Sequence, residues 1–191
     1  MNTIHLNEIC SNIKGIVSDI DGVLTSGEII YSSSGVELKS FNVKDGSSIV
    51  RLKNQGIDFA LISGRESIAN QLRAKELGIE DVYNGYLNKL PAYEELKSKY
   101  QFNDNNIAYI GDDLIDIPVM DVVALPIAVA NANSEVKKIS LHVTETAGGE
   151  GAFREAISWI ISEQGRTDEV IQSMNCLLYT SDAADERSSV D

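Results

Sequence analysis

The sequence predicts a three-layer α/β fold, in which a parallel β-sheet carries helices on both faces and one β-hairpin is inserted. Two observations favour this fold class. Short apolar runs alternate along the chain with stretches whose apolar residues recur at helical spacing. Residues 28–42 depart from this alternation, because two short strand-like segments there flank a polar turn.

The apolar runs define the predicted strands. Ile13–Ile20 comes first, and Gly15, Ile16 and Val17 within it indicate a strand buried on both faces. Five further runs of strand length follow: Phe59–Ile62, Val82–Tyr83, Ile107–Ile110, Leu125–Ala130 and Leu141–Thr144.

Stretches of helical spacing separate these runs and define the predicted helices. They are Asp45–Gln55, Glu66–Leu77, Lys89–Tyr100 and Gly151–Ile161. Asp45 is the expected N-cap of the first helix, and Gly56 and Gly78 are expected to end the first two. In the second helix the positions at helical spacing are apolar: Ile68, Ala69, Leu72 and Leu77.

The segment Glu28–Asn42 predicts the hairpin. Glu28–Tyr31 and Glu37–Phe41 are its strands, and Ser32–Gly35 is a polar four-residue turn. An isolated hairpin is marginally stable in water, so we expect it to need a partner surface.

Composition sets limits on function. The chain has 191 residues, 43% of them hydrophobic, and no shift in composition before about residue 165, which predicts one compact domain. The 16 Lys and Arg against 29 Asp and Glu give a net charge of −13, which disfavours binding to nucleic acid or to an anionic membrane. An anionic substrate would therefore need a divalent cation and a few well-placed basic residues.

The cysteine content and the N-terminus predict the compartment. Two cysteines, Cys10 and Cys176, cannot build a disulfide framework, and no signal-peptide pattern opens the chain. No apolar run reaches the ~18 residues that predict a membrane span. We expect a cytoplasmic protein.

Asp19 and Asp21 are the first candidate site residues. They lie two apart directly after a buried strand, so both side chains would face one crevice at the carboxyl edge of the sheet. Two neighbouring anions repel each other, which favours a bound cation or a shared proton. The alternative is a solvated Asp-x-Asp-Gly turn.

Two more predicted strands end in polar groups that could share a site with Asp19 and Asp21. Ser63, Gly64 and Arg65 supply a hydroxyl, an amide and a guanidinium suited to phosphoryl oxygens, although Ser63 alone could be a helix N-cap. A third strand end is followed by an acidic group, which could alternatively be a solvated helix start: Asp112, Asp113 and Asp116.

Lys89, which begins a predicted helix, is the fourth candidate for the site. Taken by itself it would be a solvated surface lysine. The order Asp19-x-Asp21, Ser63, Lys89, Gly111-Asp112-Asp113 resembles the four motifs of the haloacid dehalogenase-like phosphatase superfamily.

The match is closer to one family, the 3-deoxy-D-manno-octulosonate 8-phosphate phosphatases, over Ile13–Glu169. Four segments carry it: Asp21–Thr25, Gly35–Gly46, Gly111–Asp116 and Ala147–Ala152. The resemblance implies a Rossmann-like domain without a cap domain, in which the hairpin replaces the cap and packs in a homotetramer whose neighbouring subunits close each site.

The resemblance also implies the catalytic roles. Asp19 would be the nucleophile that forms an aspartyl-phosphate, and Asp21 the general acid and base. Mg²⁺ would be held by the Asp19 carboxylate, the Asp21 main-chain oxygen and Asp112. Asp113 and Asp116 would support the metal shell, and Ser63 and Lys89 would hold the phosphoryl oxygens.

The sugar contacts follow from the same resemblance. They would come from Asp21, Lys89 and a further set: Asn42, Val43, Lys44, Asp45, Gly46, Gly64, Arg65 and Arg73. Arg65 and Arg73 are spaced to share a helix face and could clamp a sugar carboxylate, although Arg73 alone could be a solvated helix position. Val50 departs from the basic residue common in relatives, which puts one substrate contact in doubt.

The expected reaction is Mg²⁺-dependent hydrolysis of 3-deoxy-D-manno-octulosonate 8-phosphate, a step toward lipopolysaccharide precursors. One alternative is the same chemistry on a nine-carbon, sialic-acid-type 9-phosphate; Arg65 favours the eight-carbon sugar, because nine-carbon relatives can place Glu there. The other alternative, a non-catalytic oligomerisation domain, is disfavoured by the presence of all four motifs.

The C-terminal end is expected to lie outside the domain. We expect the domain to cover residues 1–169 and a disordered tail to cover 170–191. The stretch from Cys176 to Asp191 resembles translated adapter sequence and offers no amphipathic face, so we expect it to be non-native.

Overall fold

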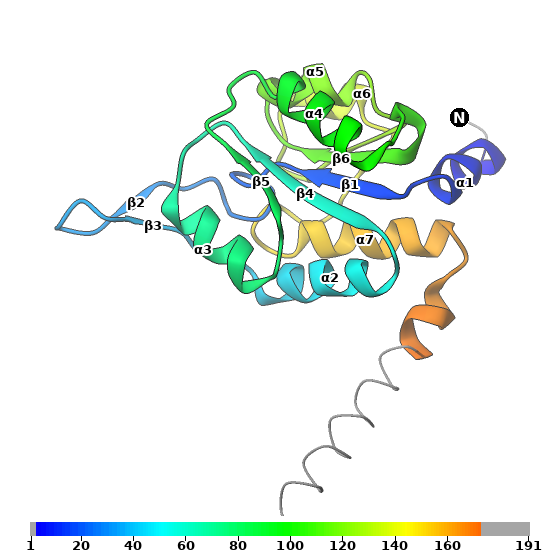
Figure 1. Cartoon of the computed structure of the whole chain (residues 1–191), viewed down its shortest axis with the longest axis horizontal. Coiled ribbons are helices and arrows are strands. Elements are labelled where there is room, and N and C mark those ends of the chain that lie inside the picture. Colours follow the sequence, from blue (N-terminus) through cyan, green and yellow to red (C-terminus); the bar gives the residue numbers. More distant parts are fainter. Residues whose placement is uncertain (1–2, 173–191) are drawn as a thin grey trace, which may run out of the picture.

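The computed structural model describes residues 3–172, and in this range a parallel sheet lies between two layers of helices (Figure 1). The strand order is β5-β4-β1-β6-β7-β8, and every neighbouring pair is parallel. The bounds are β1 Gly15–Ser18, β4 Asp58–Ser63, β5 Asp81–Asn84, β6 Ile107–Gly111, β7 Leu125–Ala128 and β8 His142–Val143. The predicted three-layer α/β fold is confirmed.

Helices cover both faces of the sheet. On one face lie α2 Val43–Asn54, α3 Ile68–Glu76 and α7 Ala152–Glu163, and on the other α4 Leu90–Tyr100, α5 Ile117–Met120 and α6 Ser134–Ile139 (Figure 1). The N-terminal helix α1, Thr3–Ser11, contacts α7. Two 3₁₀ turns, Asp104–Asn106 and Leu114–Asp116, flank β6. The helices α5 and α6 were not predicted from sequence, because four and six residues are too few to show a helical period. Helix α1 was also not predicted.

The strand order places a functional edge at the centre of the sheet. The chain moves from β1 to β4 and β5 on one side, and then crosses to β6, β7 and β8 on the other. Such a switch point leaves a crevice at the carboxyl ends of the central strands. The ends of β1, β4 and β6 therefore lie side by side, and the Asp19 amide just beyond β1 donates to the Ile110 carbonyl at 2.9 Å.

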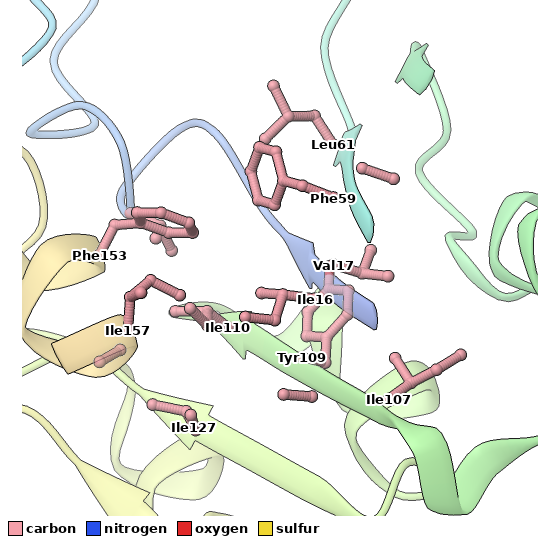
Figure 2. Packing of buried hydrophobic residues seen from close by; sticks show 14 of the residues in the cluster. Ile16, Val17, Phe59, Leu61, Ile107, Tyr109, Ile110, Ile127, Phe153 and Ile157 are labelled. Atoms are coloured by element: carbon pink, nitrogen blue, oxygen red, sulfur yellow. The ribbon is translucent and has the colours of Figure 1, made fainter. Parts of the chain in front are cut away.

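The core lies between the sheet and its helices. All four residues of β1 are buried, as predicted for a strand covered on both faces. On the α7 side, Phe153 meets Phe59 of β4 edge to face with ring centroids 5.2 Å apart, and Ile157 lies beside it (Figure 2). Removing such a buried ring costs about 3–5 kcal/mol, so this contact helps to hold β4 and α7 in place.

The predicted hairpin is confirmed and projects beyond the sheet (Figure 1). Its strands are β2 Ile30–Tyr31 and β3 Glu37–Leu38, paired antiparallel with Ile30 opposite Leu38. Large apolar side chains on it are exposed: Ile29, Ile30, Tyr31, Val36 and Leu38.

One local prediction was wrong, and one helix buries a different face from the one that its apolar residues suggest. Helix α2 is capped by Asn42, whose side chain accepts from the Lys44 amide at 2.9 Å, and Asp45 lies within the first turn. In α3 the apolar residues Ile68 and Leu72 are exposed, at 75% and 64%, whereas Asn70 and Ala74 are buried. The polar side chain is buried because it takes part in a hydrogen-bond network described below.

The C-terminal boundary also differs from the prediction. Residues 167–172 are helical and Val170 is buried, so the ordered chain passes the predicted boundary at residue 169. The stretch from Cys176 lies outside the described residues, and its non-native origin stays a prediction. No helix between residues 3 and 172 has the length and apolar character to cross a membrane. A cytoplasmic location also stays a prediction.

Candidate active site

The predicted motifs meet at the carboxyl edge of β1, β4 and β6. Asp19 follows β1 and is buried, and Ser63 is the last residue of β4 and also buried. Lys89 immediately precedes α4, and its side chain reaches Asp19. Residues far apart in the sequence thus form one polar cluster in an otherwise apolar core.

Lys89 is fully buried between two carboxylates. Its Nζ donates to Asp19 Oδ1 at 2.5 Å and to Asp116 Oδ1 at 2.6 Å. Burial opposes the charge, but the attraction of Asp19 and Asp116 outweighs it and raises the pKa of Lys89. The ammonium is therefore retained, and it neutralises part of the negative charge of the cluster.

Asp116 holds the acidic loop after β6. Its Oδ1 accepts from Lys89 and from the Tyr109 hydroxyl at 2.7 Å. Its Oδ2 accepts from the Asp112 and Asp113 amides at 2.9 and 3.1 Å. Since donors occupy both oxygens, Asp116 shapes the loop and anchors Lys89 rather than facing open space. Asp113 is exposed at the start of the following turn.

The carboxylate cluster fits a divalent cation at Asp19 and Asp112, since donors already occupy both oxygens of Asp116. Asp19, Asp112 and Asp116 each offer one oxygen within 4.8 Å of the others. Within residues 3–172, the buried Asp112 Oδ1 accepts no hydrogen bond. Burial and then repulsion from Asp19 and Asp116 raise the pKa of Asp112 to about 8. Burial also raises the pKa of Asp19 to about 6, despite Lys89. A cation beside Asp19 and Asp112 would relieve this repulsion.

Asp21 lies nearer the mouth of the site and has a partner that sequence reasoning missed. Its Oδ2 accepts from the Ser63 hydroxyl at 3.2 Å, and its Oδ1 accepts from Lys39 Nζ at 2.5 Å. Lys39 comes from the end of the hairpin, yet its side chain is only 4% exposed. A lysine on a polar hairpin is usually solvated; the one available signal was its i, i+2 spacing from Glu37, which puts both side chains on one face.

The predicted sugar-contact segment 42–46 opens α2. Asn42 caps the helix and donates to the Gly149 carbonyl at 3.3 Å, while Val43 and Lys44 are exposed. Asp45 is buried at 2% exposure and accepts from the Arg154 amide of α7 at 2.8 Å. Burial raises the pKa of Asp45 to about 6. A contact between sugar and Asp45 stays a prediction.

The two predicted clamp arginines lie on different elements. Arg65 precedes α3, and its guanidinium pairs with Glu37 Oε2 of the hairpin at 3.3 Å. Arg73 lies in the last turn of α3, pairs with Glu76 at 2.8 Å and lies over the Phe41 ring. The inference that both share one helix face was wrong, because α3 begins only at Ile68. Their roles toward substrate stay predictions.

Tight packing surrounds two of the predicted positions, Gly46 and Gly64, and the glycine-rich turn before α7. A Cβ on Gly46 would lie 2.3 Å from the Arg73 guanidinium, and one on Gly64 would lie 3.0 Å from Ile115. Gly148 packs still more closely, because a Cβ there would lie 1.6 Å from the Gly22 carbonyl oxygen. The glycine-rich turn before α7 therefore supports the loop that carries Asp21.

Comparisons with known proteins show the family of the chain. A sequence profile of the haloacid dehalogenase-like hydrolases matches residues 75–155. The chain is 41% identical over 165 residues, 86% of its length, to the 3-deoxy-D-manno-octulosonate 8-phosphate phosphatase of Salmonella typhi, of which it covers 88%.

Solved structures give the same result. The Moraxella catarrhalis 3-deoxy-D-manno-octulosonate 8-phosphate phosphatase, in complex with magnesium, phosphate and KDO, is 36% identical with a TM-score of 0.86, over 91% of this chain and 99% of that one. The cobalt-bound Haemophilus influenzae phosphatase is 39% identical with a TM-score of 0.80, over 83% and 93% of the two chains.

The fold and the strand-end carboxylates define a haloacid dehalogenase-like phosphatase, and the chain is an enzyme of that class. Within the class it belongs to the 3-deoxy-D-manno-octulosonate 8-phosphate phosphatase family.

Proposed function

We propose that this enzyme hydrolyses 3-deoxy-D-manno-octulosonate 8-phosphate to the free sugar acid and phosphate, with Mg²⁺ as cofactor and an aspartyl-phosphate intermediate. The observation that carries the proposal is the buried pairing of Asp19 with Lys89 beside the unpartnered oxygen of Asp112. This geometry is found in a chain that is 41% identical to a phosphatase named for that substrate.

Asp19 is the proposed nucleophile. Lys89 holds its Oδ1, which leaves Oδ2 to form the bond to phosphorus while the leaving oxygen departs on the opposite side. Asp19, the Asp21 main-chain oxygen and Asp112 would hold Mg²⁺. When bound there, Mg²⁺ neutralises charge between the nucleophile and the phosphoryl group.

Ser63 and Lys89 supply donors for the phosphoryl oxygens. An ammonium has three N–H donors, and two of those on Lys89 point at Asp19 and Asp116, which leaves one for substrate. The Ser63 hydroxyl can turn from Asp21 to a phosphoryl oxygen. Asp21 then protonates the leaving sugar oxygen and later takes a proton from the water that hydrolyses the intermediate.

Arg65 supports an anionic sugar acid as the leaving group. It lies just past Ser63 and retains 42% exposure of its side chain while paired with Glu37. A guanidinium at the mouth can bind a carboxylate in bidentate fashion. A nine-carbon acid offers the same carboxylate, so this contact alone does not choose between the two sugars. The eight-carbon sugar is proposed because the family is named for it and because Arg65 stands where nine-carbon relatives can place Glu.

Relative turnover of the two sugar-acid phosphates tests the proposal. With Mg²⁺ present, we expect kcat/KM for the eight-carbon substrate to exceed that for the nine-carbon substrate by about 10-fold or more. Chelation of the metal should abolish both activities, and readdition of Mg²⁺ should restore them. Faster turnover of the nine-carbon substrate would reassign the enzyme, and undiminished activity after chelation would contradict the metal assignment.

We also propose a homotetramer in which neighbouring subunits close the site. The supporting observation is a continuous apolar surface from the hairpin to α3, which contains Val36, Leu38, Ile68 and Leu72. Exposed apolar patches of this kind mark interaction surfaces. Light scattering of the wild-type protein should give four times the chain mass, whereas a fully active monomer would contradict the shared site.

A further inference from the structure

We propose that Lys39 is a positioning residue for Asp21: the hairpin carries an ammonium into the site to orient the carboxylate that handles the protons of the reaction. This inference rests on the proposed function and adds to it a residue outside the four motifs. It also gives the hairpin a part in the chemistry of its own subunit.

The geometry of Lys39 is that of a buried functional group. Its Nζ lies 2.5 Å from Asp21 Oδ1, and the side chain is 4% exposed, whereas that of Asp21 is 20% exposed. Burial of an ammonium is costly unless partners compensate for the lost water. The neighbouring hairpin residue Leu38 is 49% exposed, so the strand alternates an outward apolar side chain with an inward lysine.

A second set of contacts fixes Lys39 itself. Its Nζ donates to Asn70 Oδ1 at 3.0 Å, and Asn70 in turn donates to Asn84 Oδ1 at 3.1 Å. Asn70 is 1% exposed on the sheet-facing side of α3, which explains why a polar residue occupies a buried position there. The chain of contacts runs from the hairpin through α3 to the end of β5.

Glu37 completes the surroundings of Lys39. Its Oε1 lies 3.6 Å from Lys39 Nζ, and its Oε2 accepts from Arg65 at 3.3 Å. Lys39 donates two hydrogen bonds, to Asp21 and to Asn70, and Glu37 Oε1 lies at ion-pair distance without a hydrogen bond. The ammonium is thus held among acceptors and a carboxylate of its own chain, which favours positioning of Asp21 over direct binding of substrate.

Lys39 should matter more for the orientation of Asp21 once substrate is bound. Lys39 and Ser63 hold the two oxygens of Asp21 separately. When the Ser63 hydroxyl turns to a phosphoryl oxygen, Lys39 is the one remaining side-chain partner of Asp21 in the described part of the chain. Without it, the carboxylate could rotate away from the leaving oxygen, and misplacement of a catalytic group by about 1 Å can cost about 100-fold in rate.

Steady-state kinetics of Lys39→Met provide the first test. We expect kcat on the sugar-acid phosphate to fall by about 10- to 100-fold with KM changed less than about 3-fold, because orientation and not binding is lost. On 4-nitrophenyl phosphate, whose leaving group needs no proton, the fall should be smaller. Lys39→Arg should recover part of kcat, and Lys14→Met, at the opposite edge of the sheet, should match wild type.

The double variant with Asp21→Asn separates positioning from other roles. If Lys39 acts through Asp21, Lys39→Met should change the residual rate of Asp21→Asn by less than about 2-fold. An equal fold-loss in both backgrounds, or a rise in KM with kcat unchanged, would overturn the proposal. If Lys39→Met does not fold, Asn70→Ala takes its place; there we expect a fall of about 3- to 10-fold in kcat that again disappears in the Asp21→Asn background.

The wild-type reaction distinguishes the two proposals. Wild-type protein without Mg²⁺-dependent phosphatase activity would overturn the proposed function together with the role of Lys39. An active wild type, combined with Lys39→Met at wild-type kcat, would overturn the role of Lys39 alone.

Discussion

Gly22 and the Asp112 carboxylate are packed so closely that a Cβ on Gly22 would lie 2.1 Å from Asp112 Oδ2. Gly22 also has a φ of +110°, a backbone conformation that L side chains rarely adopt. The loop after β1 and the loop after β6 thus come together only because position 22 has no side chain. This contact places the proposed metal ligand Asp112 beside the loop that carries Asp21.

Gly22→Ala should therefore lower stability and activity by more than the backbone strain of a positive φ alone would cause. We expect a loss of about 3 kcal/mol or more in the free energy of unfolding, together with loss of phosphatase activity, because Asp112 must move. Gly56→Ala is the matched control: its φ is +69° and nothing lies within 4 Å of the added Cβ. That control should cost about 1–2 kcal/mol and keep wild-type activity. Equal effects of both variants in urea unfolding and in kcat would contradict the packing argument.

Asp19→Asn should leave a folded enzyme without hydrolysis. An amide is a poor nucleophile, and loss of a nucleophile typically costs several orders of magnitude in kcat. The neutral side chain has no charge to bury and removes repulsion with Asp116 and Asp112, and its amide oxygen can still accept from Lys89, so thermal stability without metal should not fall at neutral pH. Residual activity above about a hundredth of the wild-type value would argue against an aspartyl-phosphate.

Mg²⁺ should raise the melting temperature of the wild-type protein, because the ion binds the folded carboxylate cluster and not the unfolded chain. Asp112→Asn removes the negative charge of the side chain whose Oδ1 has no partner among residues 3–172, so the Mg²⁺-induced shift should shrink strongly. Glu135→Gln, at an exposed position on α6, is the control and should keep the full shift. An unchanged shift in Asp112→Asn would place the metal elsewhere.

The sequence predicted the sheet, the hairpin and the four motifs because each rests on a local pattern. Asp19 and Asp21 follow a buried apolar run, and parallel strands bring such ends together at one edge whatever the side-chain details. That Asp116 accepts from Tyr109 and Lys89 could not be read from spacing, since the contacts join three separate segments.

Burial that depends on tertiary contacts could not be predicted. Helical spacing alone made Ile68 and Leu72 resemble a core face, whereas α3 turns Asn70 inward to bond Lys39 and exposes both apolar residues. Lys39 was missed for the same reason, because its burial depends on α3 and not on its own strand. Asp45 was predicted to cap α2. Instead, α7 packs close by, and the Asp45 carboxylate accepts a hydrogen bond from the Arg154 amide of that helix.

Arg65→Ala should weaken use of the sugar-acid phosphate far more than use of a small phosphate ester. Because the guanidinium is proposed to bind substrate beyond the phosphoryl group, kcat/KM should fall by about 10- to 100-fold on the former and by less than about 3-fold on the latter. Arg166→Ala, at an arginine that pairs with Glu169 near the C-terminal end, is the control. Equal losses on both esters would indicate that Arg65 binds the phosphoryl group. Arg65 would then no longer favour the eight-carbon sugar.

Asp45→Asn should change how stability depends on pH. Burial raises the pKa of Asp45 to about 6 in the fold, above the ordinary value of 3.8 expected for the unfolded chain. A raised folded pKa means that protonation favours the fold. The contribution of Asp45 to stability is therefore complete below about pH 4 and is lost as the pH rises through about 6.

The asparagine variant keeps an acceptor oxygen for the Arg154 amide and has no charge to bury. The free energy of unfolding of the variant minus that of wild type should therefore grow by up to about 2–3 kcal/mol between about pH 4 and pH 7. Urea unfolding of both proteins across this range measures the difference, with Asp121→Asn at an exposed position as control. A difference that stays constant with pH would show that Asp45 is ionised in the fold at little cost, and that the Arg154 amide and the end of α7 compensate for its burial.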